Sequence, residues 1–171
     1  MTKKCPITDK LISINLLEFL VEIINYAAIT VLFQTHPELC KHSFPTLLNW
    51  TDNTTSKSWI KKAATKTMKG KALQRILCLI MINNPVGLIA EHIAGIDNIL
   101  ADAISRIFSQ NNSTLSFKKL MQEFPMMKSW NRFLPSQELL SALYSGLLEG
   151  REPGLCLPKT LGHFTQDKHI S

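Results

Sequence analysis

Apolar residues recur every three or four positions over residues 11–33, the spacing of one helical face. The stripe consists of Ile12, Leu16, Phe19, Leu20, Ile23 and Ala27. Glu18, Glu22 and Asn25 occupy the neighbouring face, with the two carboxylates one turn apart. The run is long enough to span a membrane, but two central carboxylates would each cost roughly 2.5–3.5 kcal/mol in a bilayer. The pattern therefore predicts a buried or half-buried helix of a soluble protein, with no membrane partner.

The short apolar run Thr46–Thr51 predicts a buried strand, and residues 86–92 predict a second short strand. Between them, capping side chains at 53–55 start a helix that continues to about Thr65, and a second helix is expected over 72–82. A further helix is expected over 98–108. The order is thus helix, strand, two helices, strand, helix. Strands separated by helices pair in parallel, so the pattern predicts an α/β domain with a two-stranded sheet over residues 11–108.

The chain changes character after a polar linker that begins at Ser109. Helices are expected over 115–124 and from Ser136 to Leu148, with Gly150 closing the second. We therefore predict a helical appendage over 109–150, an extended tail over 151–171, and a chain that is mostly helical overall. Residues 1–10 are polar, broken by Pro6, and show no strand alternation.

Composition and charge narrow the classes of partner. The 171 residues are 45% hydrophobic and 19% charged, as in folded soluble proteins. Nineteen Lys and Arg against thirteen Asp and Glu give a net charge of +6, which favours a polyanionic partner. Four scattered cysteines without a CxxC pair indicate a reduced, intracellular chain, with cytoplasm and nucleus both open. His36, Cys40 and His42 cluster in a loop, but no second ligand pair supports a metal site there.

Three acidic residues stand out by position: Glu18 inside the first helix, Asp52 after the first strand, and Asp102 at the start of the last core helix. The carboxyl ends of strands in an open α/β sheet face the ligand crevice, and clustered carboxylates bind hard divalent cations. Spacing alone leaves other readings open, because Asp52 could cap the following helix and Asp102 could lie on a solvated face.

Three motifs carry a resemblance to a known family. They are Thr51-Asp52-Asn53-Thr54-Thr55 followed by Ser58-Trp59; His92-Ile-Ala-Gly95-Ile-Asp-Asn98-Ile-Leu-Ala101-Asp102-Ala-Ile-Ser105-Arg106; and Ser13-Ile-Asn-Leu-Leu-Glu18. Over residues 11–108 they resemble the ribonuclease H-like domain of retrotransposon reverse transcriptase polyproteins. That family is a nuclease that cleaves the RNA strand of RNA–DNA hybrids by two-metal hydrolysis.

The resemblance implies roles for particular residues. Glu18, Asp52 and Asp102 match the family's ligands to Mg²⁺ (or Mn²⁺), and His92 matches a histidine of a mobile loop that aids proton transfer and product release. Asn98 would order the turn before the last helix, and Gly95 fits that turn, where positive φ would favour glycine. The implied partners are an RNA–DNA hybrid and an upstream reverse transcriptase segment.

A basic segment agrees with a nucleic-acid partner. Residues 53–90 contain no Asp or Glu and seven basic residues: Lys57, Lys61, Lys62, Lys66, Lys69, Lys71 and Arg75. Such a run suits a surface that follows a phosphate backbone, although scattered lysines also occur on an ordinary solvated face. It would equally serve a non-enzymatic module that binds nucleic acid or a protein.

The chain departs from the family at its beginning. The family domain opens with three antiparallel strands, the first of which carries a further metal-binding Asp. Only 17 residues precede Glu18, whereas three strands and their turns need roughly 20 or more. Asp9 is the one acid among them, and it is expected to start or cap the helix. We therefore expect a truncated domain that is inactive alone for want of that Asp.

Overall fold

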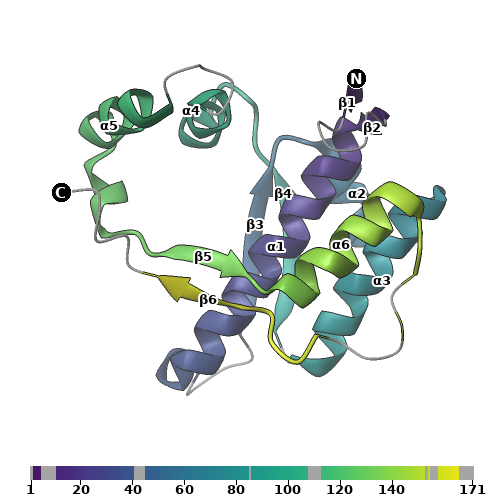
Figure 1. The fold of residues 1–171 in the computed structure, drawn as a ribbon. Helices are drawn as coiled ribbons and strands as arrows, with labels where there is room; N and C mark the ends of the chain where they lie inside the picture. The colour runs from purple at the N-terminus through teal and green to yellow at the C-terminus, as the bar shows by residue number, and fades with distance from the viewer. Residues whose placement is uncertain are drawn as a thin grey trace. The chain divides into compact units, whose positions relative to one another are not determined.

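The computed structural model describes residues 2–4, 11–40, 45–84, 86–107, 113–152, 154 and 158–165 (Figure 1). Asp9, Cys5, His42, Cys156 and His169 lie outside them. The chain mixes helix and strand and is mostly helical, as predicted. It divides into two compact units: residues 1–92 with 133–163, and residues 93–132 with 164–171.

The first unit contains most of the predicted helices and strands, in the predicted order. Its helices are α1 (Ile14–Thr35), the short 3-10 helix η1 (Pro37–Cys40), α2 (Thr54–Lys62), α3 (Met68–Asn83) and α6 (Gln137–Glu149). Strand β3 (Thr46–Thr51) pairs in parallel with β4 (Gly87–His92), with Thr51 beside His92. The prediction of two parallel strands, with two helices between them, is confirmed.

Helices α1, α3 and α6 pack together and form the core of this unit (Figure 1). The largest fully buried side chains are Phe19, Ile23 and Tyr26 of α1, Leu73, Ile76, Leu77 and Ile80 of α3, and Leu139 and Leu143 of α6. The Tyr26 hydroxyl donates a 2.5 Å hydrogen bond to the carbonyl of Val86, which ties α1 to the start of β4. Burial raises the pKa of the Tyr26 phenol.

Capping side chains set several helix boundaries. Thr67 caps α3 through its hydroxyl, which accepts from the backbone N–H of Gly70 at 3.0 Å, so α3 begins earlier than the predicted residue 72. Ser136 caps α6 in the same way, and Gly150 ends it in the left-handed conformation, as expected. Gly95 does not adopt positive φ, so that expectation was wrong; the turn forms through the N–H of Asp97 to Ala94 O instead.

Four short strands were not predicted. β1 (Thr2–Lys4) pairs antiparallel with β2 (Leu11–Ser13), in residues expected to be polar coil and the start of α1. β5 (Arg132–Pro135) pairs with β6 (Gly162–Thr165), within the expected appendage and tail. Three or four residues are too short to show alternation, and each strand depends on a partner that lies elsewhere in the chain.

The burial predicted for β3 was also wrong. Of its six residues only Thr51 is buried, and Leu48 and Trp50 are about half exposed. On β4, Ala90 is buried, while Ile89 and Glu91 are exposed. One face of the two-stranded sheet is therefore covered and the other is open.

The second unit contains α4 (Ile99–Ile107), α5 (Ser113–Glu123) and the 3-10 helix η2 (Pro125–Ser129). Leu120, Met121 and Met127 form its small core, with Leu100, Ala103, Ile104 and Phe124 packed around them. These units do not follow the boundaries expected at residues 108 and 150. Helix α6 packs on α3 in the first unit, whereas α4 packs on α5 in the second.

Candidate functional site

The start of α1 is hydrogen-bonded to the turn that follows β3. The side chain of Asn53 caps α2, its Oδ1 accepting from the N–H groups of Thr55 at 2.8 Å and Ser56 at 2.9 Å. The Nδ2 of Asn53 donates to Oδ1 of Asn15 at 2.9 Å. One amide side chain thus starts one helix and holds a second, which brings α1 beside the carboxyl end of β3.

An aromatic pair reinforces this junction. The rings of Phe19 on α1 and Trp59 on α2 meet edge to face, with their centroids 5.4 Å apart and their planes at 84°. Phe19 is fully buried. The ring contact therefore holds α1, the helix that carries Glu18 and Glu22, against α2.

Three carboxyl groups gather where α1 faces the end of β3: Glu18, Glu22 and Asp52. Glu22 is 5% exposed. Its burial raises the pKa from 4.5 to about 7, a hydrogen bond from Thr51 opposes this shift, and the charges of Glu18 and Asp52 add to it. Oε2 of Glu22 is buried and has no hydrogen-bond partner among the described residues. The structure therefore brings the predicted residues Glu18 and Asp52 to one region, together with a third acid.

Glu22 was not predicted as a site residue. The sequence places it one turn after Glu18 on the same helical face, and that spacing was its only signal. Which of the two carboxyl groups becomes buried depends on where the end of β3 docks on α1. Periodicity along α1 does not contain this information.

These groups are oxygen donors of the kind that hard divalent cations prefer. Among the described residues, no three His, Cys, Asp or Glu side chains lie close enough together to hold a metal ion. Asp52 is exposed, whereas Glu18 is half-buried. The chemistry of the donors fits Mg²⁺ or Mn²⁺, and the predicted ligand set of Glu18, Asp52 and Asp102 stays a prediction.

His92 and Asp102 complete the set of predicted catalytic residues. His92 ends β4 directly beside Thr51, so it lies at the same sheet edge as Asp52, and its side chain is exposed. Asp102 lies in the first turn of α4, also exposed, and belongs to the second unit. Within the first unit, His92 ends β4 beside the residue that precedes Asp52, while Glu18 and Asp52 both act on Glu22.

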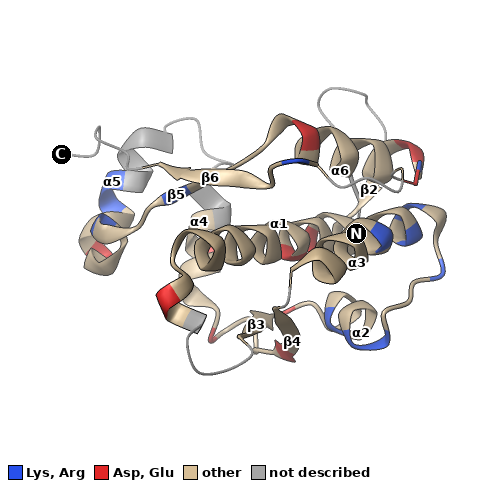
Figure 2. Cartoon of the chain, turned by 90° about the horizontal axis from the view of Figure 1, so that it is seen from below, with Lys and Arg blue, Asp and Glu red and all other residues tan. Residues whose placement is uncertain are grey.

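The predicted basic residues lie on α2, on α3 and on the loop between them (Figure 2). Lys61, Lys62, Lys66 and Lys71 are exposed, and Lys69 is half-buried. Two of the seven form ion pairs with acids outside the segment: Lys57 with Glu91 at 2.6 Å, and Arg75 with Glu152. The other five form no ion pair with another described residue, so their charges stay available for an anionic partner.

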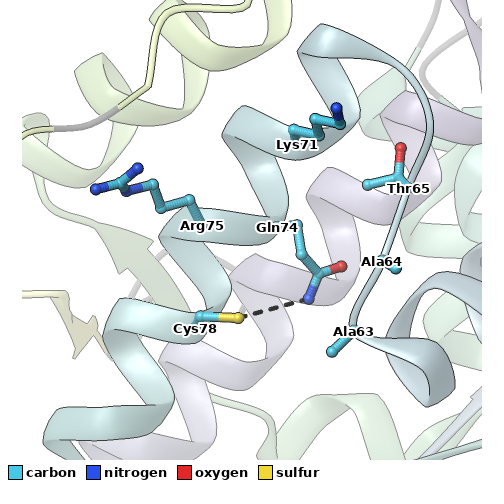
Figure 3. Close-up of a pocket in the computed structure, with 7 residues that line it drawn as sticks. All are labelled: Ala63, Ala64, Thr65, Lys71, Gln74, Arg75 and Cys78. Atoms are coloured by element: carbon cyan, nitrogen blue, oxygen red, sulfur yellow. Dashed lines mark hydrogen bonds between the residues drawn. The ribbon is translucent and has the colours of Figure 1, made fainter.

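A hollow of about 480 Å³ lies between α3 and the loop before it (Figure 3). It is lined by Ala63, Ala64, Thr65, Lys71, Gln74, Arg75 and Cys78. Gln74 is buried, and its Nε2 donates weakly to Sγ of Cys78 at 3.7 Å. Its Oε1 has no hydrogen-bond partner in the part of the chain that the structure describes. This hollow could not be predicted from the sequence, because it forms where residues 63–65 lie along α3.

Helix α1 is long and apolar enough to cross a membrane, and it is the one such helix among the described residues. In the structure its buried residues include Glu22 and Thr30. No family model, curated protein or solved structure matches the chain.

Proposed function

We propose that this chain is a retroelement-derived ribonuclease H-like domain whose ancestral reaction is cleavage of the RNA strand of RNA–DNA hybrids. The observation that carries the proposal is that Glu18 of α1 and Asp52, which follows β3, both act electrostatically on the buried Glu22. Glu18 and Asp52 belong to two of the motifs that predicted a common site, and these motifs lie far apart in the sequence. The order of elements from α1 to α4 and the parallel β3–β4 pair support it further.

In this proposal Glu18, Asp52 and Asp102 hold Mg²⁺ or Mn²⁺. Bound divalent cations would supply activation of the attacking water and stabilisation of the leaving oxygen. Asn53 and Asn15 fix the angle between the two carboxylate-bearing elements. His92, which is exposed beside Thr51, would exchange a proton with solvent near the reacting phosphate in this proposal.

The basic residues of α2 and α3 would contact the phosphates of the hybrid. Lys61, Lys62, Lys66 and Lys71 are exposed and free of acidic neighbours within their own segment. Phosphate contacts of this kind give affinity and register without base sequence specificity. Recognition of the RNA strand then depends on its 2′-hydroxyls and helix shape.

We further propose that the chain alone has little or no nuclease activity, because the described residues ahead of α1 (2–4 and 11–13) include no Asp to match the first-strand Asp implied by the family resemblance. The strands ahead of α1, β1 and β2, form a separate pair and do not extend the β3–β4 sheet. An upstream reverse transcriptase segment would supply what is lacking.

The alternative is a non-enzymatic module that binds nucleic acid through the same basic run. One experiment separates the two functions: binding and cleavage of a labelled RNA–DNA hybrid are measured with Mn²⁺ and, separately, with EDTA. Mn²⁺ is used at roughly 5 mM, a concentration expected to saturate a weak carboxylate site. For the ribonuclease H-like domain we expect Mn²⁺ to strengthen hybrid binding, with the gain lost in Asp52→Asn and kept in Asp97→Asn. Hybrid affinity that changes neither with Mn²⁺ nor with Asp52→Asn would favour the alternative. Cleavage by the wild-type chain that Asp102→Asn abolishes would refute the proposed inactivity.

A further inference from the structure

The open face of the β3–β4 sheet carries a cluster of large exposed side chains. Leu48 is 48% exposed, Trp50 56% and Ile89 49%. Leu48 and Ile89 are register partners, as are Trp50 and Glu91, so these four side chains lie on one face. We call this group the Trp50 face.

Such a face is unusual for a parallel pair, because parallel strands are normally covered on both sides. The opposite face is covered in the ordinary way: Thr51 and Ala90 are buried, and α1 contacts β3. Asn49, which points to the covered side, has its Nδ2 buried. An indole ring flanked by two aliphatic side chains thus remains available to a ligand.

Lysines of α2 border the Trp50 face. Helix α2 packs alongside β4, and Lys57 forms a 2.6 Å ion pair with Glu91, the residue beside Trp50. Lys61, one turn further along α2, also acts on Glu91 and is exposed, and Lys62 follows it. Since Lys57 balances the charge of Glu91, Lys61 provides additional positive charge at the edge of the Trp50 face. The exposed Asp52 lies two residues after Trp50, just beyond the carboxyl end of β3.

We propose that the Trp50 face binds single-stranded nucleic acid, with an unpaired base stacked on the Trp50 indole and the flanking phosphates held by Lys61 and Lys62. A flat aromatic ring beside cations is the arrangement that binds single strands with little sequence preference, because every base has a face to stack. A base inside a duplex is already stacked on its neighbours. The ligand is therefore an unpaired strand, such as one that extends from a hybrid.

This inference rests on the proposed nucleic-acid function and adds a base-binding site to it. It is tested with two fluorescein-labelled strands of equal length, an oligodeoxythymidylate and an abasic strand with the same phosphates. We expect Trp50→Ala to weaken binding of the oligodeoxythymidylate about ten-fold, the effect of losing one stacked base, and to leave abasic binding unchanged. Trp50→Phe should retain most of the affinity. Trp130→Ala, which removes a comparably exposed indole from the second unit, is the matched control and should change neither.

The lysines are expected to behave differently from the ring. Lys61→Ala should weaken both strands equally and reduce the salt dependence of binding by about one counterion, whereas Trp50→Ala should leave that dependence unchanged. Circular dichroism of each variant verifies folding.

The outcomes that overturn the inference are distinct. If the chain binds hybrid and single strands but Trp50→Ala changes neither, the base site is wrong and the proposed function stands. If it binds no nucleic acid, both fail. If Trp50→Ala converts a dimer to a monomer in sedimentation, or abolishes binding to phosphatidylserine vesicles while strand binding is unaffected, then a second copy or a membrane occupies this face instead.

Discussion

The buried carboxyl group of Glu22 makes the stability of this protein depend on pH in a way that one substitution should remove. Burial raises its pKa from 4.5 to about 7 in the folded chain. A difference of 2.5 pKa units at 1.36 kcal/mol each amounts to about 3 kcal/mol in the free energy of unfolding. Because the pKa of Glu22 is higher in the folded chain than in the unfolded one, this contribution to the free energy of unfolding is complete below about pH 4.5. It is lost progressively as pH rises to 7, where the folded chain holds a buried charge.

Glu22→Gln keeps the shape of the side chain but cannot ionise. We expect the variant to equal the wild type near pH 4.5 and to exceed it by up to about 3 kcal/mol at pH 8. Urea unfolding, followed by far-UV circular dichroism at half-unit steps from pH 4.5 to 8, measures the difference directly. Glu123→Gln, an exposed carboxyl group on α5, serves as the control for a surface substitution. A Glu22→Gln variant that is less stable than wild type by a constant amount at every pH would refute the reasoning.

Three further substitutions test the packing of the first unit by chemical denaturation. Asn53→Ala removes the cap of α2 and the tie to Asn15, and should cost about 1–2 kcal/mol, whereas Asn83→Ala, at an exposed helix end, should cost little. Gly70→Ala places a Cβ against Oγ1 of Thr65 and should lower the free energy of unfolding by about 1–3 kcal/mol. The double variant Gly70→Ala with Thr65→Ala should recover stability, and no recovery would mean that this contact is not the cause. Leu143→Ala on α6 should cost about 2–5 kcal/mol because the side chain is 1% exposed, and a cost no larger than that of half-buried Leu148→Ala would contradict the packing of α6 into the core.

Much of the first unit follows from local sequence patterns. The three- and four-residue spacing of apolar side chains located α1, and β3 was predicted at its observed ends because Pro45 and Asp52 bound a short apolar run. The caps at Asn53 and Ser136 were visible because side-chain acceptors precede the helices they start.

What could not be predicted depends on contacts between distant segments. β5 and β6 pair across the whole of α6, and neither four-residue strand has a pattern of its own. The prediction of a buried β3 was wrong because a run of apolar residues does not show whether one or both faces of a sheet are covered. In the structure Leu48 and Trp50 lie on the uncovered face. The burial of Glu22 likewise depends on the docking of β3 beside α1.

The central claim is that Glu18 and Asp52 belong to one cation-binding site at the carboxyl end of β3. Calorimetric titration of the whole chain with Mn²⁺ at pH 8 tests it most directly, with Asp52→Asn, Glu18→Gln and the control Asp97→Asn. We predict measurable Mn²⁺ binding that is weakened at least ten-fold by either of the first two substitutions and is unchanged by the third. Mn²⁺ binding that is insensitive to both Asp52→Asn and Glu18→Gln, or no binding at all, would contradict the account.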